Sequence, residues 1–166
     1  MQESRYLKDN LENIQKLLSI PALRNFETSN LSRLLHLSKI REYEAGEKII
    51  QEGDNDPWLY FLIEGRIRIE KKGIEIGVFT ERGEIFGEMR VIDSRARSAT
   101  VVALEDTVCL AVNTAATDRM ESLEGRDEQL DFLLLLYRIF AEFLSIRLRL
   151  TSEELIKAQK RLKALE

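Results

Sequence analysis

The sequence predicts a mainly β protein with flanking helices, in which an eight-stranded antiparallel β-roll of the jelly-roll type lies between N-terminal helices and a long C-terminal helix. Seven of the eight glycines lie between Gly46 and Gly87, where they separate short runs rich in β-branched and aromatic residues. Because glycine reaches positive φ at little cost, this spacing is typical of consecutive strands joined by tight turns. On both sides of this region, apolar residues recur at helical spacing instead.

The predicted elements follow in order along the chain. Residues 1–37 are expected to form N-terminal helices, because Leu7, Leu11, Ile14 and Leu18 fall on one helical face and a second short apolar run ends at Leu37. The roll is expected over residues 38–113. Its predicted strands are a weak one near Arg41, then 48–50, 58–63, 66–70, 75–79, a weak one near Ile85, 100–104 and 107–112. Residues 114–166 are expected to form C-terminal helices, a short one near 114–123 and a long one from about Arg126 to Glu166.

The last part of the long helix carries an apolar seam. Its members recur at spacings of three and four, the a/d pattern of a coiled coil, and are Leu148, Thr151, Leu155, Ala158, Leu162 and Leu165. This pattern predicts a parallel two-stranded coiled coil and therefore a homodimer. The alternative is a monomer whose long helix folds back on its own N-terminal helix.

Composition argues against several classes of function. Lys and Arg number 25 against 29 Asp and Glu, a formal net charge of −4, which disfavours a nucleic acid binder with a net basic surface. The one cysteine, Cys109, and the one histidine, His36, cannot supply the ligands of a zinc site or of a cupin-like metalloenzyme. No Ser/His/Asp, Cys/His or Walker-type arrangement is present. We therefore expect a protein that is not an enzyme and holds no metal or other cofactor.

The same features indicate a compartment. No apolar run reaches the length of about 18 residues that a membrane span needs, and the N-terminus lacks the apolar core of a signal peptide. A single cysteine also rules out an intramolecular disulfide. The sequence predicts a cytoplasmic protein that neither spans a membrane nor is secreted.

Residues 83–101, GEIFGEMRVIDSRARSATV, carry the clearest chemistry in the chain. Gly87, placed before a short helix, leaves backbone N–H groups at the helix start, where an anion is favoured. Arg97 can donate a forked pair of hydrogen bonds to a phosphate, and Ser98 can add a hydroxyl donor. Glu88 would repel a phosphate but is a good acceptor for a ribose hydroxyl. This combination predicts a site for a small phosphate ester of a sugar.

These residues resemble the cyclic nucleotide-binding domain family, of the catabolite activator protein and protein kinase A regulatory subunit type. The shared pattern is F-G-E, eight residues and then R-S-A-T-V, with the family's turn patterns upstream at 44–54 and 60–65. The resemblance implies a β-roll whose phosphate-binding cassette, residues 86–100, holds a 3′,5′-cyclic nucleotide. It implies that Glu88 binds the ribose 2′-hydroxyl and Arg97 the cyclic phosphate, that Met89 is an apolar hinge, and that the phosphate pocket is shaped by Gly87, Ser98 and Ala99.

The resemblance extends to the C-terminal helix. The segment around Thr151 and Ser152 looks like the dimer helix of the catabolite activator protein, where a Thr-Ser pair shared between two subunits contacts the adenine amino group. By resemblance, Thr151 and Ser152 favour cyclic AMP over cyclic GMP. The alternative role for these two residues is a polar layer between paired helices.

Together these features predict a cyclic nucleotide sensor. Binding of cyclic AMP is expected to close the cassette, re-seat the C-terminal helix and change what that helix presents to a downstream effector protein or domain. Direct DNA binding is not expected, because no helix-turn-helix follows the dimer helix before Glu166. The alternative is a ligand-free β-roll that acts as a dimerisation scaffold, with Glu88 and Arg97 as a structural ion pair.

Overall fold

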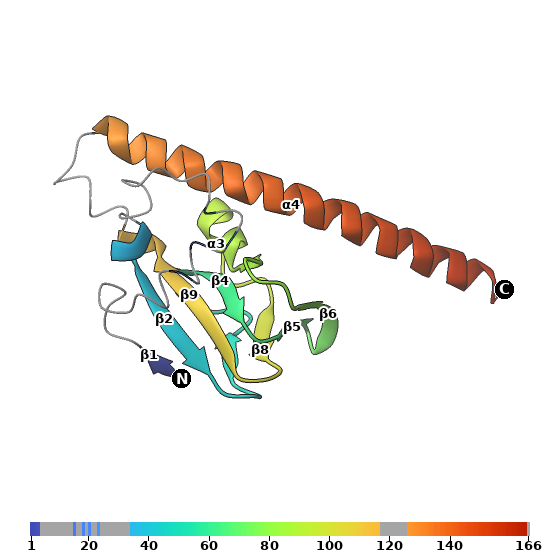
Figure 1. Cartoon of the computed structure of the whole chain (residues 1–166). Coiled ribbons are helices and arrows are strands. Elements are labelled where there is room, and N and C mark those ends of the chain that lie inside the picture. Colours follow the sequence, from blue (N-terminus) through green and yellow to red (C-terminus); the bar gives the residue numbers. More distant parts are fainter. Residues whose placement is uncertain are drawn as a thin grey trace. The chain divides into compact units, whose positions relative to one another are not determined.

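The computed structural model of the chain describes residues 1–3, 15, 18, 20, 23, 34–116 and 126–165. The chain divides into two units, Met1–Gly125 and Arg126–Glu166. Each unit is described by itself. The first contains the strands and the second is a long helix (Figure 1).

The first unit contains all the strands that the structure describes, and most of them are short. Over its described residues the elements are, in chain order, β1 (Gln2–Glu3), β2 (Ser38–Tyr43), β3 (Lys48–Ile50), β4 (Trp58–Glu64), β5 (Ile67–Lys71), β6 (Ile74–Phe79), β7 (Ile85–Phe86), α3 (Glu88–Asp93), β8 (Thr100–Ala103), β9 (Thr107–Asn113) and η3 (Thr114–Ala116). The predicted weak strands near Arg41 and Ile85 are present as β2 and β7, and β3 has the predicted bounds.

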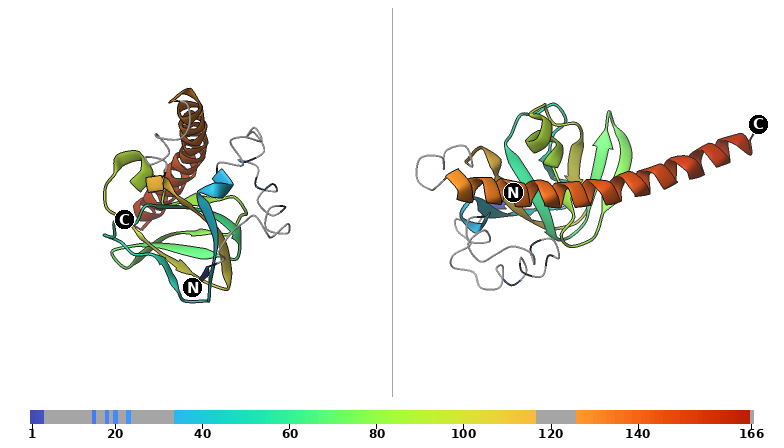
Figure 2. Two further views of the ribbon diagram at one scale, coloured as in Figure 1. Left: turned by 90° about the vertical axis from the view of Figure 1, so that its left-hand side faces the viewer. Right: turned by 90° about the horizontal axis from the view of Figure 1, so that it is seen from above.

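The strands form two antiparallel sheets. The order is β1-β2-β9-β4-β7 in one sheet and β3-β8-β5-β6 in the other. Seen end-on, the two sheets curve around a shared interior (Figure 2). The predicted antiparallel β-roll is confirmed. β1 is an addition, because Glu3 pairs with Arg41 at the edge of β2.

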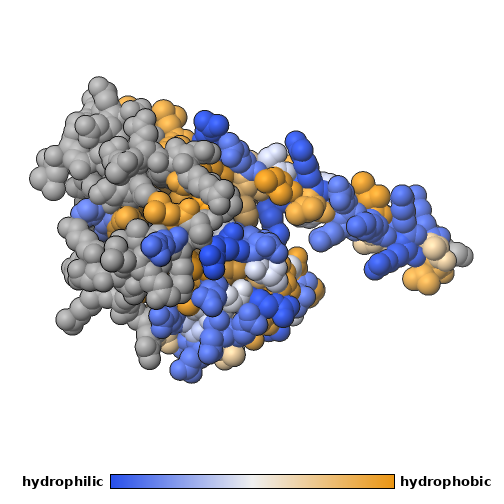
Figure 3. All heavy atoms as spheres, viewed as in Figure 1, coloured by the Kyte–Doolittle hydropathy of each residue, from blue (hydrophilic) through white to orange (hydrophobic). Residues whose placement is uncertain are grey.

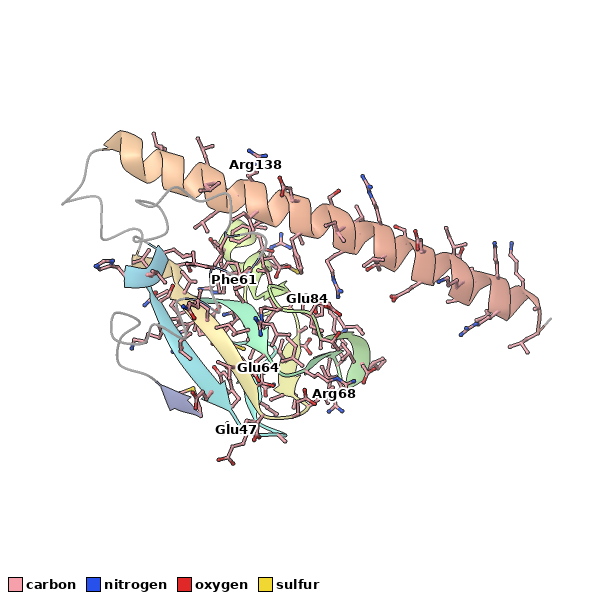
Figure 4. All side chains as sticks on the ribbon, in the orientation of Figure 1. Glu47, Phe61, Glu64, Arg68, Glu84 and Arg138 are labelled. Carbon is pink, nitrogen blue, oxygen red and sulfur yellow. The ribbon has the colours of Figure 1, made fainter. Side chains whose placement is uncertain are left out.

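The core of the roll lies between the sheets. In β4 the residues Leu59–Ile63 are all buried, so this strand is covered on both faces, and its sequence is a continuous apolar run rather than an alternating one. Phe61 lies inside the roll, whereas Glu47 points outward (Figure 4). The rings of Tyr60 and Phe86 stack with centroids 5.1 Å apart. This contact fixes β7 against β4 at Phe86, the first residue of the predicted cassette.

The predicted N-terminal helices lie mostly outside the described residues. Gln15, Leu18 and residues 34–36 are helical. Within the range 1–37 expected to form helices, Gln2 and Glu3 instead form β1, where they pair with β2. Of the short helix predicted near 114–123, the described part is the 3-10 turn η3, and the rest lies outside the described residues.

The second unit contains the predicted long helix, α4 (Arg126–Lys163), which has 38 residues. Within it Arg138 and Glu142 form an ion pair of 3.2 Å one turn apart, and the Arg138 side chain projects away from the helix (Figure 4). Apolar and charged side chains alternate along its C-terminal half (Figure 3). Over the part of the chain that the structure describes, no helix is both long and apolar enough to cross a membrane.

Candidate functional site

The predicted cassette surrounds the short helix α3, between β7 and β8. Gly87 precedes the helix in the left-handed conformation, with φ 83°, and Ser94 follows it with φ 55°. The Ser94 N–H closes the helix by donating to the carbonyl oxygen of Arg90 at 3.0 Å. The helix that the sequence predicted after Gly87 is therefore present, with glycine at the position that needs positive φ.

A glycine is also required at position 87 because the Arg97 side chain lies too close to its backbone to leave room for a Cβ. A Cβ at this position would lie 2.6 Å from Nη1 of Arg97 and 3.1 Å from the carbonyl oxygen of Trp58. Because glycine has no Cβ, the guanidinium can lie against the backbone, where Nη1 donates to the Gly87 carbonyl oxygen at 2.9 Å. Gly87 and Arg97, both predicted from sequence, are thus brought into direct contact.

Arg97 is a buried cation, only 4% exposed. Its Nε donates to Oδ2 of Asp56 at 2.9 Å and its Nη2 donates to Oδ1 at 2.5 Å, which makes a forked ion pair. The same Nη2 also donates to the carbonyl oxygen of Trp58. With the bond to Gly87, four of the five guanidinium N–H groups have named acceptors.

Asp56 is a site residue that the sequence analysis missed. The carboxylate that pairs with Arg97 is Asp56 rather than Glu88, the partner expected under the scaffold alternative. Asp56 Oδ1 also accepts from the Trp58 N–H at 3.2 Å. An acidic residue in the turn before a strand is ordinary, so no local signal distinguished it.

The electrostatics of Asp56 follow from these contacts. Burial by itself raises the pKa of its carboxyl group. The hydrogen bonds and charge of Arg97, helped by the Trp58 N–H and the charge of Arg41, outweigh burial and hold the pKa below its ordinary value. Asp56 is therefore a carboxylate at neutral pH and a full counterion of Arg97.

Arg90 joins the end of α3 to the turn before β4. Its Nη1 donates to the carbonyl oxygen of Ser94 at 2.8 Å. Its Nη2 donates to the backbone carbonyl oxygen of Asn55 at 3.2 Å, and its Nε to that of Asp56 at 3.3 Å. The guanidinium thus supplies a donor to the Ser94 carbonyl at the end of α3 and two donors to backbone carbonyls of the segment before β4. The cassette and the turn that carries Asp56 are held together on two sides, by Arg90 and by Arg97.

The other predicted residues of the roll lie around the same cassette. The Ser98 hydroxyl donates to Sδ of Met89 at 3.4 Å, so the structure brings these two together across the cassette. Met89 is half exposed, at 49%. Glu88 is the first residue of α3, and Ala99 directly precedes β8, both partly exposed. The roles of these four residues toward a ligand stay predictions.

Comparison with known proteins establishes the family. Residues 40–121 match the family model of the cyclic nucleotide-binding domain. These residues belong to the cyclic nucleotide-binding domain family. A cGMP-dependent protein kinase of Eimeria tenella is 30% identical over 109 residues, which cover 66% of this chain and 11% of that protein. The cAMP-dependent protein kinase type II regulatory subunit of Drosophila melanogaster is 37% identical over 101 residues, which cover 57% of this chain and 26% of that protein.

A solved structure agrees with this family. The catabolite activator protein of Thermus thermophilus superposes with a TM-score of 0.61 at 28% identity, over 81% of this chain and 61% of that chain. The chain matches only 11% and 26% of the length of the two kinase relatives. Its cyclic nucleotide-binding domain is therefore homologous to one portion of cAMP- and cGMP-dependent kinases and their subunits.

Thr151 and Ser152 lie outside the cyclic nucleotide-binding domain, on α4 in the second unit. Both are exposed, and the Ser152 hydroxyl donates to the carbonyl oxygen of Leu148 one turn earlier at 2.8 Å. The structure brings together the cassette residues, which all lie in the first unit. It does not place Thr151 and Ser152 relative to them. Base contact by Thr151 and Ser152 stays a prediction.

Acid should lower the free energy of unfolding of the cyclic nucleotide-binding domain, because it protonates Asp56. Because the pKa of this carboxyl is lower in the folded than in the unfolded chain, the ion pair with Arg97 stabilises the fold above about pH 4. That contribution is lost as the pH falls through the folded-state pKa. Asp56 is 32% exposed, so we expect a loss of about 1 kcal/mol or less.

Urea unfolding of the wild-type chain and of Asp56→Asn at about pH 5 and about pH 2.5 measures this contribution, since the linkage is confined to the acid range. The free energy of unfolding should fall further in the wild type than in the variant. The same fall in both proteins would show that Asp56 is not linked to folding in this way.

Proposed function

We propose that the domain binds a 3′,5′-cyclic nucleotide and acts as a sensor rather than as an enzyme. The observation that carries this proposal is a buried arginine, Arg97, whose guanidinium lies against Gly87 within a cassette of the cyclic nucleotide-binding domain family. A guanidinium in a largely dry site suits the single negative charge of a cyclic phosphodiester, because its planar fork can hold two phosphate oxygens.

Each cassette residue has a distinct proposed role. Arg97 neutralises the cyclic phosphate, while the backbone from Gly87 to Glu88 and the hydroxyl of Ser98 add donors. The Glu88 carboxylate accepts from the ribose 2′-hydroxyl, a bond that a 2′-deoxy nucleotide cannot make. Ala99 is small enough to leave room for the phosphate, and Met89 responds to occupancy because its contact with Ser98 lies across the cassette.

We propose cyclic AMP as the preferred ligand and cyclic GMP as the weaker one. Support comes from the hydroxyls of Thr151 and Ser152, both exposed on α4, which can accept from the adenine 6-amino group. A hydroxyl can also donate to the 6-oxo group of guanine. We therefore expect a modest preference of about tenfold.

The fluorescence of Trp58 tests the proposed function. Trp58 is the one tryptophan of the chain, its carbonyl accepts from Arg97, and its ring centroid lies 3.9 Å from Cζ of Arg41. Cyclic AMP and cyclic GMP should give saturable changes in emission, whereas 5′-AMP, which lacks the cyclic diester, should not. In a Thr151→Ala, Ser152→Ala double variant the preference for cyclic AMP should disappear. The absence of both a saturable signal and thermal stabilisation with either cyclic nucleotide would contradict binding.

We also propose a homodimer formed through α4, with the helix transmitting occupancy to an effector. Support comes from Leu148, Leu155 and Leu162, which recur every seven residues on one continuous helix and are 69%, 58% and 67% exposed. Sedimentation velocity of the whole chain, with and without cyclic AMP, should show a dimer. A monomer at concentrations of tens of micromolar, about −6 kcal/mol of association, would contradict it.

A ligand-free dimerisation scaffold is the second candidate function. One observation favours it: the guanidinium of Arg97 is already paired with Asp56. Under this alternative the ion pair is purely structural, and neither cyclic nucleotide should bind.

A further inference from the structure

We propose that Asp56 is a built-in competitor of the nucleotide phosphate. Its carboxylate occupies the fork of Arg97 in this structure and must leave before a cyclic phosphate can take that fork. The inference rests on the proposed function of the same site, and it reconciles that function with the ion pair that favours a scaffold.

The donors of Arg97 are nearly all occupied. The edge formed by Nε and Nη2 is held by the two carboxylate oxygens of Asp56. The second N–H of Nη2 donates to the carbonyl of Trp58, and Nη1 donates to that of Gly87. Among the described residues, one guanidinium N–H on Nη1 is left without a named acceptor. A forked bond to phosphate needs two N–H groups on one edge, so the phosphate has to displace an acceptor.

Asp56 is the acceptor that can leave. The carbonyl of Trp58 is part of β4, where this residue pairs with Asn113, and the carbonyl of Gly87 is fixed by the left-handed turn before α3. The Asp56 carboxylate, by contrast, is a side-chain group that is already 32% exposed. Two anions beside one guanidinium would also repel each other, which favours departure of the carboxylate.

The backbone beside Asp56 has its own attachments to the cassette. The Gly53 N–H donates to the carbonyl oxygen of Arg97 at 2.9 Å, and Arg90 donates to the backbone carbonyl of Asp56 itself at 3.3 Å. The carboxylate can therefore swing out by side-chain rotation while the turn stays in place. The ion pair keeps the buried cation neutralised without a nucleotide, and it lowers the affinity for one by the cost of breaking the pair.

The test compares Asp56→Asn with the wild-type chain and with Asp54→Asn. Asp54 lies in the same turn, its side chain is exposed, and its change removes the same charge. Trp58 fluorescence is titrated with cyclic AMP and cyclic GMP, and melting temperatures are recorded with and without ligand. We expect Asp56→Asn to bind cyclic AMP about tenfold more tightly, because one charged hydrogen-bond partner no longer competes. The melting temperature of Asp56→Asn should be lower than that of the wild type without nucleotide, and it should rise by more when nucleotide binds. Asp54→Asn should behave as the wild type in both respects.

Equal or weaker binding by Asp56→Asn would overturn the competitor role, because a residue that only positions Arg97 would lower the affinity when removed. If the wild type binds and Asp56→Asn binds no more tightly, the competitor role fails while the proposed function stands. If none of the three proteins binds either nucleotide, the proposed function fails and the competitor role with it.

A measurement on the wild-type chain covers the case in which Asp56→Asn does not fold. Carbon-detected NMR of the Asp56 carboxyl should show it moving to the position of a solvated carboxylate at saturating cyclic AMP. The Arg97 Nε–H resonance should shift in the same titration, because its 2.9 Å bond to Asp56 is replaced. An Asp56 signal unchanged at saturation would overturn the inference.

Discussion

Replacing Arg97 with glutamine should lower the affinity for cyclic AMP by at least about 100-fold. The change removes the one buried cation of the cassette and its planar fork together. Two charge-assisted hydrogen bonds are lost, each contributing about 1.5–3 kcal/mol, and about 1.4 kcal/mol is a factor of ten in the dissociation constant. Isothermal titration calorimetry of the whole chain measures the effect directly.

Arg95→Gln is the matched control. Arg95 lies two residues before Arg97, carries the same charge and is exposed, so its loss should leave binding as in the wild type. Arg97→Gln should also melt at a lower temperature, because the carbonyls of Gly87 and Trp58 lose a donor. Its circular dichroism should remain that of a β protein. Wild-type affinity in a folded Arg97→Gln would show that Arg97 does not bind the phosphate.

Replacing Gly65 with alanine should lower the free energy of unfolding by about 3 kcal/mol or more. Gly65 follows β4 with φ 98°, a conformation that alanine adopts at a cost. A Cβ there would lie 2.5 Å from Oγ1 of Thr107 and 2.7 Å from both the carbonyl oxygen of Asp106 and Cα of Thr107. Two of these three atoms are backbone, so no rotation of a side chain relieves the overlap.

Gly46→Ala separates the effect of φ from the effect of crowding. Gly46 has φ 87°, yet a Cβ there would meet nothing within 4 Å. We expect Gly46→Ala to lower the free energy of unfolding by only about 1 kcal/mol, the cost of the left-handed backbone alone. Urea unfolding of the two variants and the wild type gives both values. Equal losses in the two variants would contradict the close contact between Gly65 and Thr107.

The fold was largely predictable because its signals are local. Glycines at the turns and β-branched runs between them located most strands, and the bounds of β3 agree with the prediction. The two-residue strand β1 was not predicted, since it depends on pairing with the distant edge of β2. A strand that short has no periodicity of its own.

The site was predictable to the extent that it is contiguous. Gly87 and Arg97 lie ten residues apart in one motif, and in the structure Nη1 of Arg97 lies 2.9 Å from the carbonyl oxygen of Gly87. Asp56 lies 41 residues before Arg97, and the contact exists only because the turn before β4 meets the cassette in the folded roll. The contact between Ser98 and Met89 likewise depends on the path of α3. Residue type alone indicated the chemistry of the cassette but not the carboxylate that already occupies its arginine.

The most direct test of cyclic nucleotide binding is isothermal titration calorimetry of the wild-type chain after it has been denatured and refolded to remove any co-purified nucleotide. We predict saturable binding of one cyclic AMP per chain in the micromolar range or tighter, about −8 kcal/mol or more favourable, with cyclic GMP weaker. No heat with either nucleotide, together with an unchanged melting temperature, would contradict the sensor and leave Arg97 and Asp56 as a structural pair.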